Sequence, residues 1–410
     1  MDLTASPNPD AETSGDARLL LPLGLLALGI MAPVTLPVPV LRELVQERFD
    51  VSELLTSLFM SVNMVGALLC APLAGAMTDR LRRSRIILIG GLIVDALCFF
   101  ALTAPLPFGA FLAIRFLEGC AHISALSVLL ALGSQALPQA RRGRAMGFVG
   151  GGMMLGVALG APIGGLLGGA GPGVPLLAGG ALLLIAAAFA ALTVGEASGR
   201  EERPGLREIT RSLRAHPEIF APLAFAFADR FTVGFFTTTF SLYVTRIFDL
   251  SSAEVGLAIA SFMIPFALLS YPFGRLAERR SQIALLCGGS LLYGCGTAAV
   301  GFAAPPTLYF LMFAIGITAA VMFVPSMLMT IRIAPDSIRA TALGAFNAAG
   351  SLGFVVGPVA GGAISQWVAT QHGWLAGYRA AFAAAGASEV LCVALALPVL
   401  LRLRRLGRIA

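Results

Sequence analysis

The sequence predicts an all-α membrane protein in which 12 transmembrane helices form two pseudo-symmetric six-helix bundles. Composition is the first observation. Of the 410 residues, 57% are hydrophobic and only 12% are charged, whereas a soluble domain carries about 25% charged residues. The second is that apolar runs of about 20 residues recur, a length that crosses a hydrocarbon core about 30 Å thick. The third is a charged motif that closes one apolar run and returns half a chain later.

The apolar runs are expected to be helices, because lipid cannot satisfy an exposed backbone and the alternating ten-residue segments of a β-barrel are absent. The runs lie at residues 19–41, 53–77, 86–104, 108–136, 145–169, 174–194, 219–244, 253–276, 283–303, 306–331, 341–365 and 376–400. The predicted organisation is a disordered tail (1–18), an N-terminal six-helix bundle (19–195), a central linker (196–218), a C-terminal six-helix bundle (219–401) and a basic tail (402–410).

Arginine decides the orientation, since all 28 basic residues are arginine. With the N-terminus placed in the cytoplasm, 22 arginines fall on the cytoplasmic side, 4 on the outer side, and Arg115 and Arg230 inside helices. This asymmetry follows the positive-inside rule and predicts that both termini are cytoplasmic. The arginines on the cytoplasmic side then account for the net charge of +6, so no nucleic-acid partner is expected. The absence of lysine and the abundance of alanine, glycine and arginine indicate a bacterial inner membrane.

The charged motif occurs once in each half, with its two acids 199 residues apart, at Gly75, Asp79, Arg80 and Arg83 and again at Gly274, Glu278 and Arg279. Repeats at half-chain spacing are typical of two-halved transporters. We expect Asp79 near the N-terminus of the 341–365 helix, where a carboxylate is stabilised by the helix dipole. Such a contact would exist in only one state and act as a conformational switch. The alternative is that the arginines mark topology alone.

These residues also resemble a known family, the major facilitator superfamily. The stretch from Gly75 to Arg83 looks like its signature between the second and third helices. Arg115-Phe116-x-x-Gly119 is similar to a second signature, and Gly357, Pro358 and Gly361 fall in a glycine-proline motif of the 341–365 helix. The 145–169 helix resembles the motif of proton-coupled antiporters at Gly156, Gly160, Pro162, Gly164 and Gly165. The resemblance implies the major facilitator fold, alternating access and antiport.

The two glycine motifs also have a direct physical reading. Small residues at every fourth position make a smooth helix face that lets two backbones approach closely, and proline removes a backbone hydrogen bond and bends the helix. Both helices are expected to meet partners across the two-bundle interface and to take part in gating. Ordinary close packing without a gating role is the alternative.

Charges inside the apolar runs mark the candidate site, because an intramembrane charge needs a partner, water or a proton. Arg115, Glu118 and His122 lie on one stripe of a helix, at i, i+3 and i+7. None has a counterpart 199 residues later, so the repeated architecture does not demand them. We interpret Arg115 and Glu118 as a proton site, with His122 as a relay. The alternative is a structural ion pair beside a hydrogen-bonded histidine.

Asp229 and Arg230 are adjacent and point about 100° apart, so we expect them not to neutralise each other. Asp229 shares a helix face with Phe236 and Tyr243, a pattern of either a wet cavity wall or aromatic packing. The other polar contacts expected in the cavity are Asn63 and Asn347. Asp95 and Glu389 lie in helices expected at the periphery, and we predict that they are structurally paired or protonated.

The predicted function is secondary active transport by alternating access, with proton-coupled export of a small amphipathic organic compound or drug. Uptake or facilitated diffusion of a sugar or organic acid is the alternative within transport, and a non-transporting membrane sensor is the alternative outside it. No phosphate-binding loop, zinc spacing or nucleophile motif is present, so we expect no enzyme activity, catalytic residue, metal or cofactor. The expected partners are the substrate, protons and the lipid bilayer, with the protein itself a monomer.

Overall fold

A computed structural model describes residues 9–81, 84–138, 142–195, 211, 214–335 and 338–406, and only the backbone of 9–19, 72–81, 142–143, 278 and 340 within them. The described residues contain helices and no strands, and 12 of the helical segments are long and apolar enough to cross a membrane. The predicted all-α fold with 12 transmembrane helices is therefore confirmed.

The first half of the chain contains α1 (Pro9–Thr35), two short turns of helix at Val38–Val40 and Arg42–Glu47, α2 (Glu53–Leu81), α3 (Ser84–Ala101), α4 (Phe108–Gln135), α5 (Arg142–Gly168) and α6 (Val174–Thr193). The second half contains a short helical turn at Pro217–Ile219, α8 (Phe220–Thr237), α9 (Thr239–Phe248), α10 (Ser252–Arg279), α11 (Gln282–Val300), α12 (Pro305–Ile333), α13 (Arg339–His372) and α14 (Trp374–Arg405).

Several boundaries differ from the sequence prediction. Helix α13 continues past residue 365 to His372, and α14 continues to Arg405, inside the predicted basic tail. Helix α1 begins at Pro9, inside the segment predicted as a disordered tail, and proline is favoured at a first helical position. It ends at Thr35 rather than residue 41, because Pro37 and Pro39 lack the N–H groups that would continue it. The predicted helix at 219–244 is broken at Thr238, whose φ of −134° and ψ of −70° are not helical.

The break between α8 and α9 has a local cause. The hydroxyls of Thr237 and Thr238 both donate to the Gly234 carbonyl oxygen, each at 3.0 Å. Side-chain hydroxyls that bond a nearby carbonyl offer the backbone an alternative to its own ladder, and a run of threonines is stiff at χ1. The chain therefore turns at this point.

The two halves have the same pattern of helix packing, which is the structural form of the internal repeat. In the first half, α1 packs on α5, α2 on α4 and α3 on α6. In the second half, α8 packs on α13, α10 on α12 and α11 on α14, which is the same set of pairs taken in chain order. Each half thus packs as a six-helix bundle, and one continuous cluster of buried apolar residues runs through both halves.

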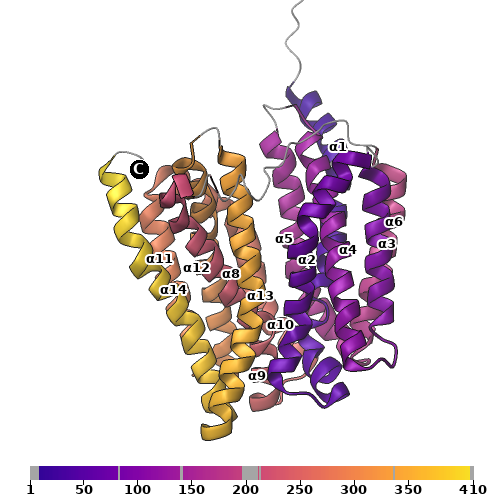
Figure 1. Cartoon of the computed structure of the whole chain (residues 1–410), viewed down its shortest axis with the longest axis vertical. Helices are drawn as coiled ribbons and strands as arrows, with labels where there is room; N and C mark the ends of the chain where they lie inside the picture. The colour runs from indigo at the N-terminus through magenta and orange to yellow at the C-terminus, as the bar shows by residue number, and fades with distance from the viewer. Residues whose placement is uncertain are drawn as a thin grey trace, which may run out of the picture.

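The bundles meet along α2 with α13 and α5 with α10. Figure 1 shows the start of α1 and the end of α14 at the top, and the bundles converging toward the bottom, near α9. We call this lower zone the far interface; it is made by residues 38–54 and 161–168 of the first half and 241–256 and 362–378 of the second. Most of the predicted linker at 196–218 lies outside the described residues.

Candidate substrate and proton pathway

A buried ion pair on α4 joins Arg115 and Glu118, which are only 1% and 2% exposed. Arg115 also donates from Nε to the Phe59 carbonyl oxygen at 3.0 Å, and its guanidinium lies 4.2 Å from the centre of the Phe59 ring. Asn63 of α2 donates from Nδ2 to Glu118 Oε2 at 2.6 Å. Gly119 makes this contact possible, because a Cβ there would overlap the Asn63 backbone. The predicted residues Arg115, Glu118 and Asn63 therefore form one cluster.

A second buried pair extends this cluster toward α3. His122 Nδ1 lies 2.9 Å from Asp95 Oδ2, so Asp95 is paired as the sequence suggested. The outer atoms of the pair, His122 Nε2 and Asp95 Oδ1, are buried and have no hydrogen-bond partner in the described part of the chain. A neutral pair of this kind carries one mobile proton, which is the property a relay needs.

The same residues offer the ligand atoms of a metal site. One atom each of Asp95, Glu118 and His122 lies within 4.8 Å of the others, and this donor set would suit a divalent transition metal. The Arg115 guanidinium, however, is bonded to Glu118 and brings a positive charge to the same place. A proton is the smaller charge to add beside a guanidinium, so the arrangement suits proton binding better than metal binding.

The pair on α8 corrects one expectation. Arg230 Nη1 lies 3.5 Å from Asp229 Oδ2, so the two adjacent residues do form an ion pair. The Cα–Cβ bonds of neighbouring helical residues diverge, but the long arginine side chain curls back to reach the carboxylate. The guanidinium also lies 5.4 Å from the Phe323 ring and 5.5 Å from the Phe346 ring.

The aromatic residues of the α8–α9 stripe are packed inside the second bundle. Phe236 is 1% exposed and stacks on Phe262 at 5.3 Å, and Tyr243 is 1% exposed and packs edge-on to Phe382. In this conformation both therefore belong to the core rather than to a cavity wall. Asn347 of α13 is exposed.

The structure does not describe the side chains of most of the predicted switch motif. No side chain is described for Gly75, Asp79, Arg80, Arg83 or Glu278, so the proposed contacts of the two acids stay predictions. Of the remaining members, Gly274 faces Val324 of α12 within the same bundle and Arg279 is exposed.

The glycine motifs pack mainly within each bundle. Gly156 and Gly160 of α5 face the backbone of α1, Gly164 faces the backbone of Leu36 just after α1, and Pro162 lies within the same stretch of α5. On α13, Gly357 and Pro358 face α8, and Gly361 faces Thr239 of α9. Gly165 differs, because it crosses to the other bundle: Ser252 of α10 donates from Oγ to its carbonyl oxygen at 2.9 Å, and a Cβ there would overlap the Ser252 carbonyl oxygen.

Gly165→Ala is therefore expected to disfavour the closed far interface, because its methyl group cannot fit unless α5 and α10 separate. A cysteine pair placed across this interface should crosslink more slowly in the variant than in the parent. Gly169→Ala is the matched control, since a Cβ at Gly169 is in ordinary contact 3.5 Å from the Leu166 carbonyl oxygen. Equal crosslinking rates in the parent and Gly165→Ala would contradict the prediction.

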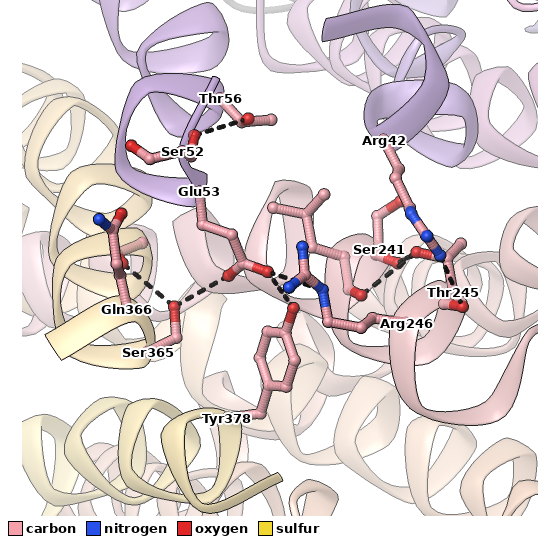
Figure 2. A network of polar contacts seen from close by, with 12 residues as sticks. Arg42, Ser52, Glu53, Thr56, Ser241, Thr245, Arg246, Ser365, Gln366 and Tyr378 are labelled. Atoms are coloured by element: carbon pink, nitrogen blue, oxygen red, sulfur yellow. Dashed lines mark hydrogen bonds and ion pairs between the residues drawn. The ribbon is translucent and has the colours of Figure 1, made fainter. Parts of the chain in front are cut away.

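A polar network holds the far interface together, and sequence reasoning missed it (Figure 2). Glu53, at the start of α2, has a fully buried side chain. Its carboxylate accepts hydrogen bonds from the Tyr378 hydroxyl and from Ser365 Oγ, the latter at 3.1 Å, and lies 3.4 Å from Arg246 Nε. All three partners belong to the second half, so one carboxylate of the first bundle gathers donors from α9, α13 and α14.

Further contacts surround this network. Gln366 accepts the Leu54 backbone N–H at 3.1 Å, Arg42 donates to the Thr245 carbonyl oxygen at 3.1 Å, and Ser241 donates to the Val38 carbonyl oxygen at 2.8 Å. Where both partners are described, the side-chain hydrogen bonds and ion pairs between the halves all lie at this end. The only sign of this network in the sequence is that ionisable residues lie at the ends of the predicted spans. That position does not predict which of these residues contact one another.

Burial also shifts the pKa values of two ionisable groups that lie just outside the membrane spans. Burial raises the pKa of Glu43, and a hydrogen bond to its own backbone only partly opposes this shift. Burial lowers the pKa of Arg48, whose guanidinium donates to the Leu102 carbonyl oxygen at 2.8 Å and to that of Ala104. Arg48 thus ties the segment before α2 to the loop after α3.

The fold and buried charges together define a membrane transporter of two similar bundles. The family model described as Major Facilitator Superfamily matches residues 23–242 and again 223–408. The chain belongs to the major facilitator superfamily, and it is a multi-pass membrane transporter rather than an enzyme.

Two curated relatives match part of the chain. "Multidrug resistance protein 2" of Bacillus subtilis (strain 168) is 24% identical over 253 residues, covering 58% of this chain and 62% of that protein. "Magnetosome protein MamH" of Paramagnetospirillum magneticum (strain ATCC 700264 / AMB-1) is 27% identical over 211 residues, covering 49% of this chain and 47% of that protein. The chain thus spans less than two thirds of the length of either relative.

Solved structures share the fold at low identity. A bacterial homologue of the human lysosomal transporter Spinster, in an inward-facing and occupied conformation, gives a TM-score of 0.80 at 16% identity, covering 93% of this chain and 96% of that chain. The D-xylose-proton symporter gives 0.75 at 16% identity, covering 93% and 97%. The nucleoside transporter NupG gives 0.76 at 13% identity, covering 93% and 99%.

Proposed function

We propose that this protein exports a small amphipathic organic compound across the bacterial inner membrane in exchange for protons. The observation that carries the proposal is the buried Arg115–Glu118 pair with Asn63, continued by His122 and Asp95. The internal repeat does not require these charges, and charges buried inside a membrane protein are costly, which favours a functional role for them. Export is supported by the antiporter-like glycine motif of α5 and by the similarity to a multidrug resistance protein.

The proposed mechanism is rocking of the halves, residues 19–195 and 219–401, about the far interface and joined by the linker at 196–218. We assign the termini to the cytoplasm from the 22 arginines on that side. The far interface is then the outer gate, and it is closed in this conformation. The corresponding state is inward-facing, ready to receive substrate from the cytoplasm.

A substrate screen tests the proposal most directly. Purified protein would be screened by thermal shift against amphipathic drugs, sugars, nucleosides and organic acids, and each hit would be followed as flux in proteoliposomes with and without a pH gradient. Exchange of an amphipathic compound against protons is the expected result. Gradient-independent flux of a sugar, or binding without flux, would replace export by the alternatives of facilitated diffusion or sensing.

Coupling should depend on a buried carboxylate. Either Glu118→Gln or Asp229→Asn is expected to abolish concentrative transport while substrate binding and exchange remain, because the amide keeps the shape but cannot carry the proton. The measurement is flux driven by a pH gradient alongside counterflow in the same vesicles. Glu254→Gln, at an exposed carboxylate in the capping box of α10, is the control. Wild-type accumulation by both neutral variants would remove Glu118 and Asp229 from the proton path.

Orientation can be checked by labelling single cysteines in a cysteine-free background. Cysteines placed at Arg141 and Gly205 are expected to be shielded from an impermeant thiol reagent in intact cells, since the arginine distribution puts both positions in the cytoplasm. Cysteines at Glu47 and His372, beside the far interface, are expected to label. The reverse pattern would invert the topology and make the closed gate the cytoplasmic one.

A further inference from the structure

A buried carboxyl group on α14 has no hydrogen-bond donor among the residues that the structure describes. It belongs to Glu389, which is 0% exposed and both of whose carboxylate oxygens lack a donor there. Close packing of α11 on α14 fixes its position, because Gly294 leaves no room for a side chain beside the Gly386 carbonyl oxygen and the Glu389 Cβ. An ionised carboxylate inside a membrane protein requires a compensating group, and no described residue supplies one here.

The polar groups beside Glu389 are themselves committed elsewhere. They are the hydroxyls of Thr232 on α8 and Ser290 on α11, which lie near enough to the carboxyl group to act on it, although each donates its own proton elsewhere. Thr232 donates to the Ala385 carbonyl oxygen at 3.4 Å, and Ser290 donates to Met322 Sδ at 3.2 Å. Only their oxygen lone pairs remain available. The two hydroxyl oxygens can then only accept a hydrogen bond, and an ionised carboxylate can also only accept one. A carboxyl group that binds a proton becomes a donor, so a protonated Glu389 matches these acceptors.

The charges around Glu389 balance only when it is protonated. The other titratable or charged groups near it on the helices packed around it are Asp229, Arg230, Cys287, Tyr293 and Cys392. Asp229 and Arg230 pair with each other at 3.5 Å and cancel. The charged residues of α13, which also packs on α14, lie at its two ends. An ionised Glu389 would therefore leave one net negative charge in this buried group.

A narrow pocket in the second bundle adjoins the site. It has about 160 Å³ of space not filled by atoms, which includes open solvent, and it is lined by Asp229, Ser290 and Ser326 together with apolar side chains of α8, α11 and α12. Ser290 belongs both to this pocket and to the surroundings of Glu389. The hydroxyl of Tyr293, buried and without a partner, lies close enough to both carboxyl groups to feel their charge. The pocket thus links Asp229 to Glu389 through Ser290.

We propose that Glu389 is a proton-binding site in the second bundle, occupied by a proton in this conformation and reached from the Asp229 pocket through Ser290. The site lies outside the α4 cluster and adds a further carboxyl group to the candidate proton carriers Glu118 and Asp229. The use of this proton in transport rests on the proposed function, whereas its presence on Glu389 does not.

Infrared spectroscopy of the protein in lipid vesicles tests the presence of the proton without any transport. The wild-type protein is expected to show the C=O stretching band of a protonated carboxyl group at neutral pH. Glu389→Gln should lose that band, and Glu389→Asp should shift it rather than remove it. Glu254→Gln, at the exposed carboxylate of α10, is the matched control and should leave it unchanged. A band of undiminished area in Glu389→Gln would overturn the proposal even if proton-coupled export is later demonstrated.

Two further measurements decide which ion Glu389 binds and by which route that ion reaches it. Replacing choline chloride with sodium chloride at constant pH should leave the band in place; its loss would identify a sodium site and overturn the assignment to a proton. Transfer into D₂O should shift the band, and the shift should be slower in Ser290→Val than in the wild type, because the variant lacks the hydroxyl between the pocket and Glu389. Equal exchange rates would overturn the route through Ser290.

Discussion

Arg115→Met is expected to destabilise the protein by about 3–5 kcal/mol, because it leaves Glu118 as an uncompensated buried charge. Both side chains are almost fully buried, and the only other donor to the Glu118 carboxylate among the described residues is Asn63. The variant also removes the hydrogen bond that Arg115 Nε donates to the Phe59 carbonyl oxygen. The measurement is the free energy of unfolding of the purified protein by a denaturing detergent.

The double variant Arg115→Met/Glu118→Met separates the charge from the packing. Replacing both members by apolar side chains of similar volume is often neutral or stabilising, so most of the loss should be recovered. Arg404→Met, at an exposed residue of α14, is the matched single-charge control and should change the free energy by less than about 0.5 kcal/mol. A loss for Arg115→Met no larger than that control would show that the α4 pair is not an ion pair.

The sequence predicts the helices well because burial in lipid leaves a strong local signal. A run such as 108–136 is apolar along its length, and the observed α4 spans Phe108–Gln135. The pattern also placed Arg115, Glu118 and His122 on one face, since helical spacing alone decides that. The errors arose where a local break overrides the average, as at Pro37 and at Thr238.

Contacts between distant segments could not be predicted in the same way. Glu53 and Tyr378 are 325 residues apart, and no periodicity relates them. Their contact depends on which conformation the two bundles adopt, and a single sequence encodes several. The pairing of Asp229 with Arg230 was missed for a different reason, because helical angles describe where a side chain starts and not how far a flexible arginine reaches.

Contacts within one bundle and contacts between the two bundles have different consequences. The α4 cluster and Glu389 lie within single bundles, so the proposed rocking motion leaves both of these proposed proton sites intact. The Glu53 network joins the bundles, so it exists only while the far interface is closed. Stability therefore reports on the first class, and the population of states reports on the second.

Glu53→Ala is accordingly expected to open the far interface without unfolding either bundle. The variant deletes the acceptor for Tyr378 and Ser365 and the partner of Arg246, and all three of these residues lie in the second half (Figure 2). Removing one partner of a buried, hydrogen-bonded charge pair costs about 2–5 kcal/mol. The open state does not contain the network, so the loss falls on the closed state alone. A loss of 2 kcal/mol lowers the ratio of closed to open molecules by about 30-fold.

Spin labels on cysteines at Ala170 and Gln371, one exposed position from each half near the far interface, would report this ratio as a distance distribution. In Glu53→Ala the distribution should move to longer distances, whereas Tyr378→Phe, which removes only one hydrogen bond, should move it less. Glu47→Ala is the matched control, because Glu47 pairs with Arg42 of its own bundle through a half-exposed side chain, so the substitution deletes no direct contact with the second half. An unchanged distribution in Glu53→Ala, or an equal change in Glu47→Ala, would mean that close packing of α2 on α13 and of α5 on α10 closes this gate without help from the polar network.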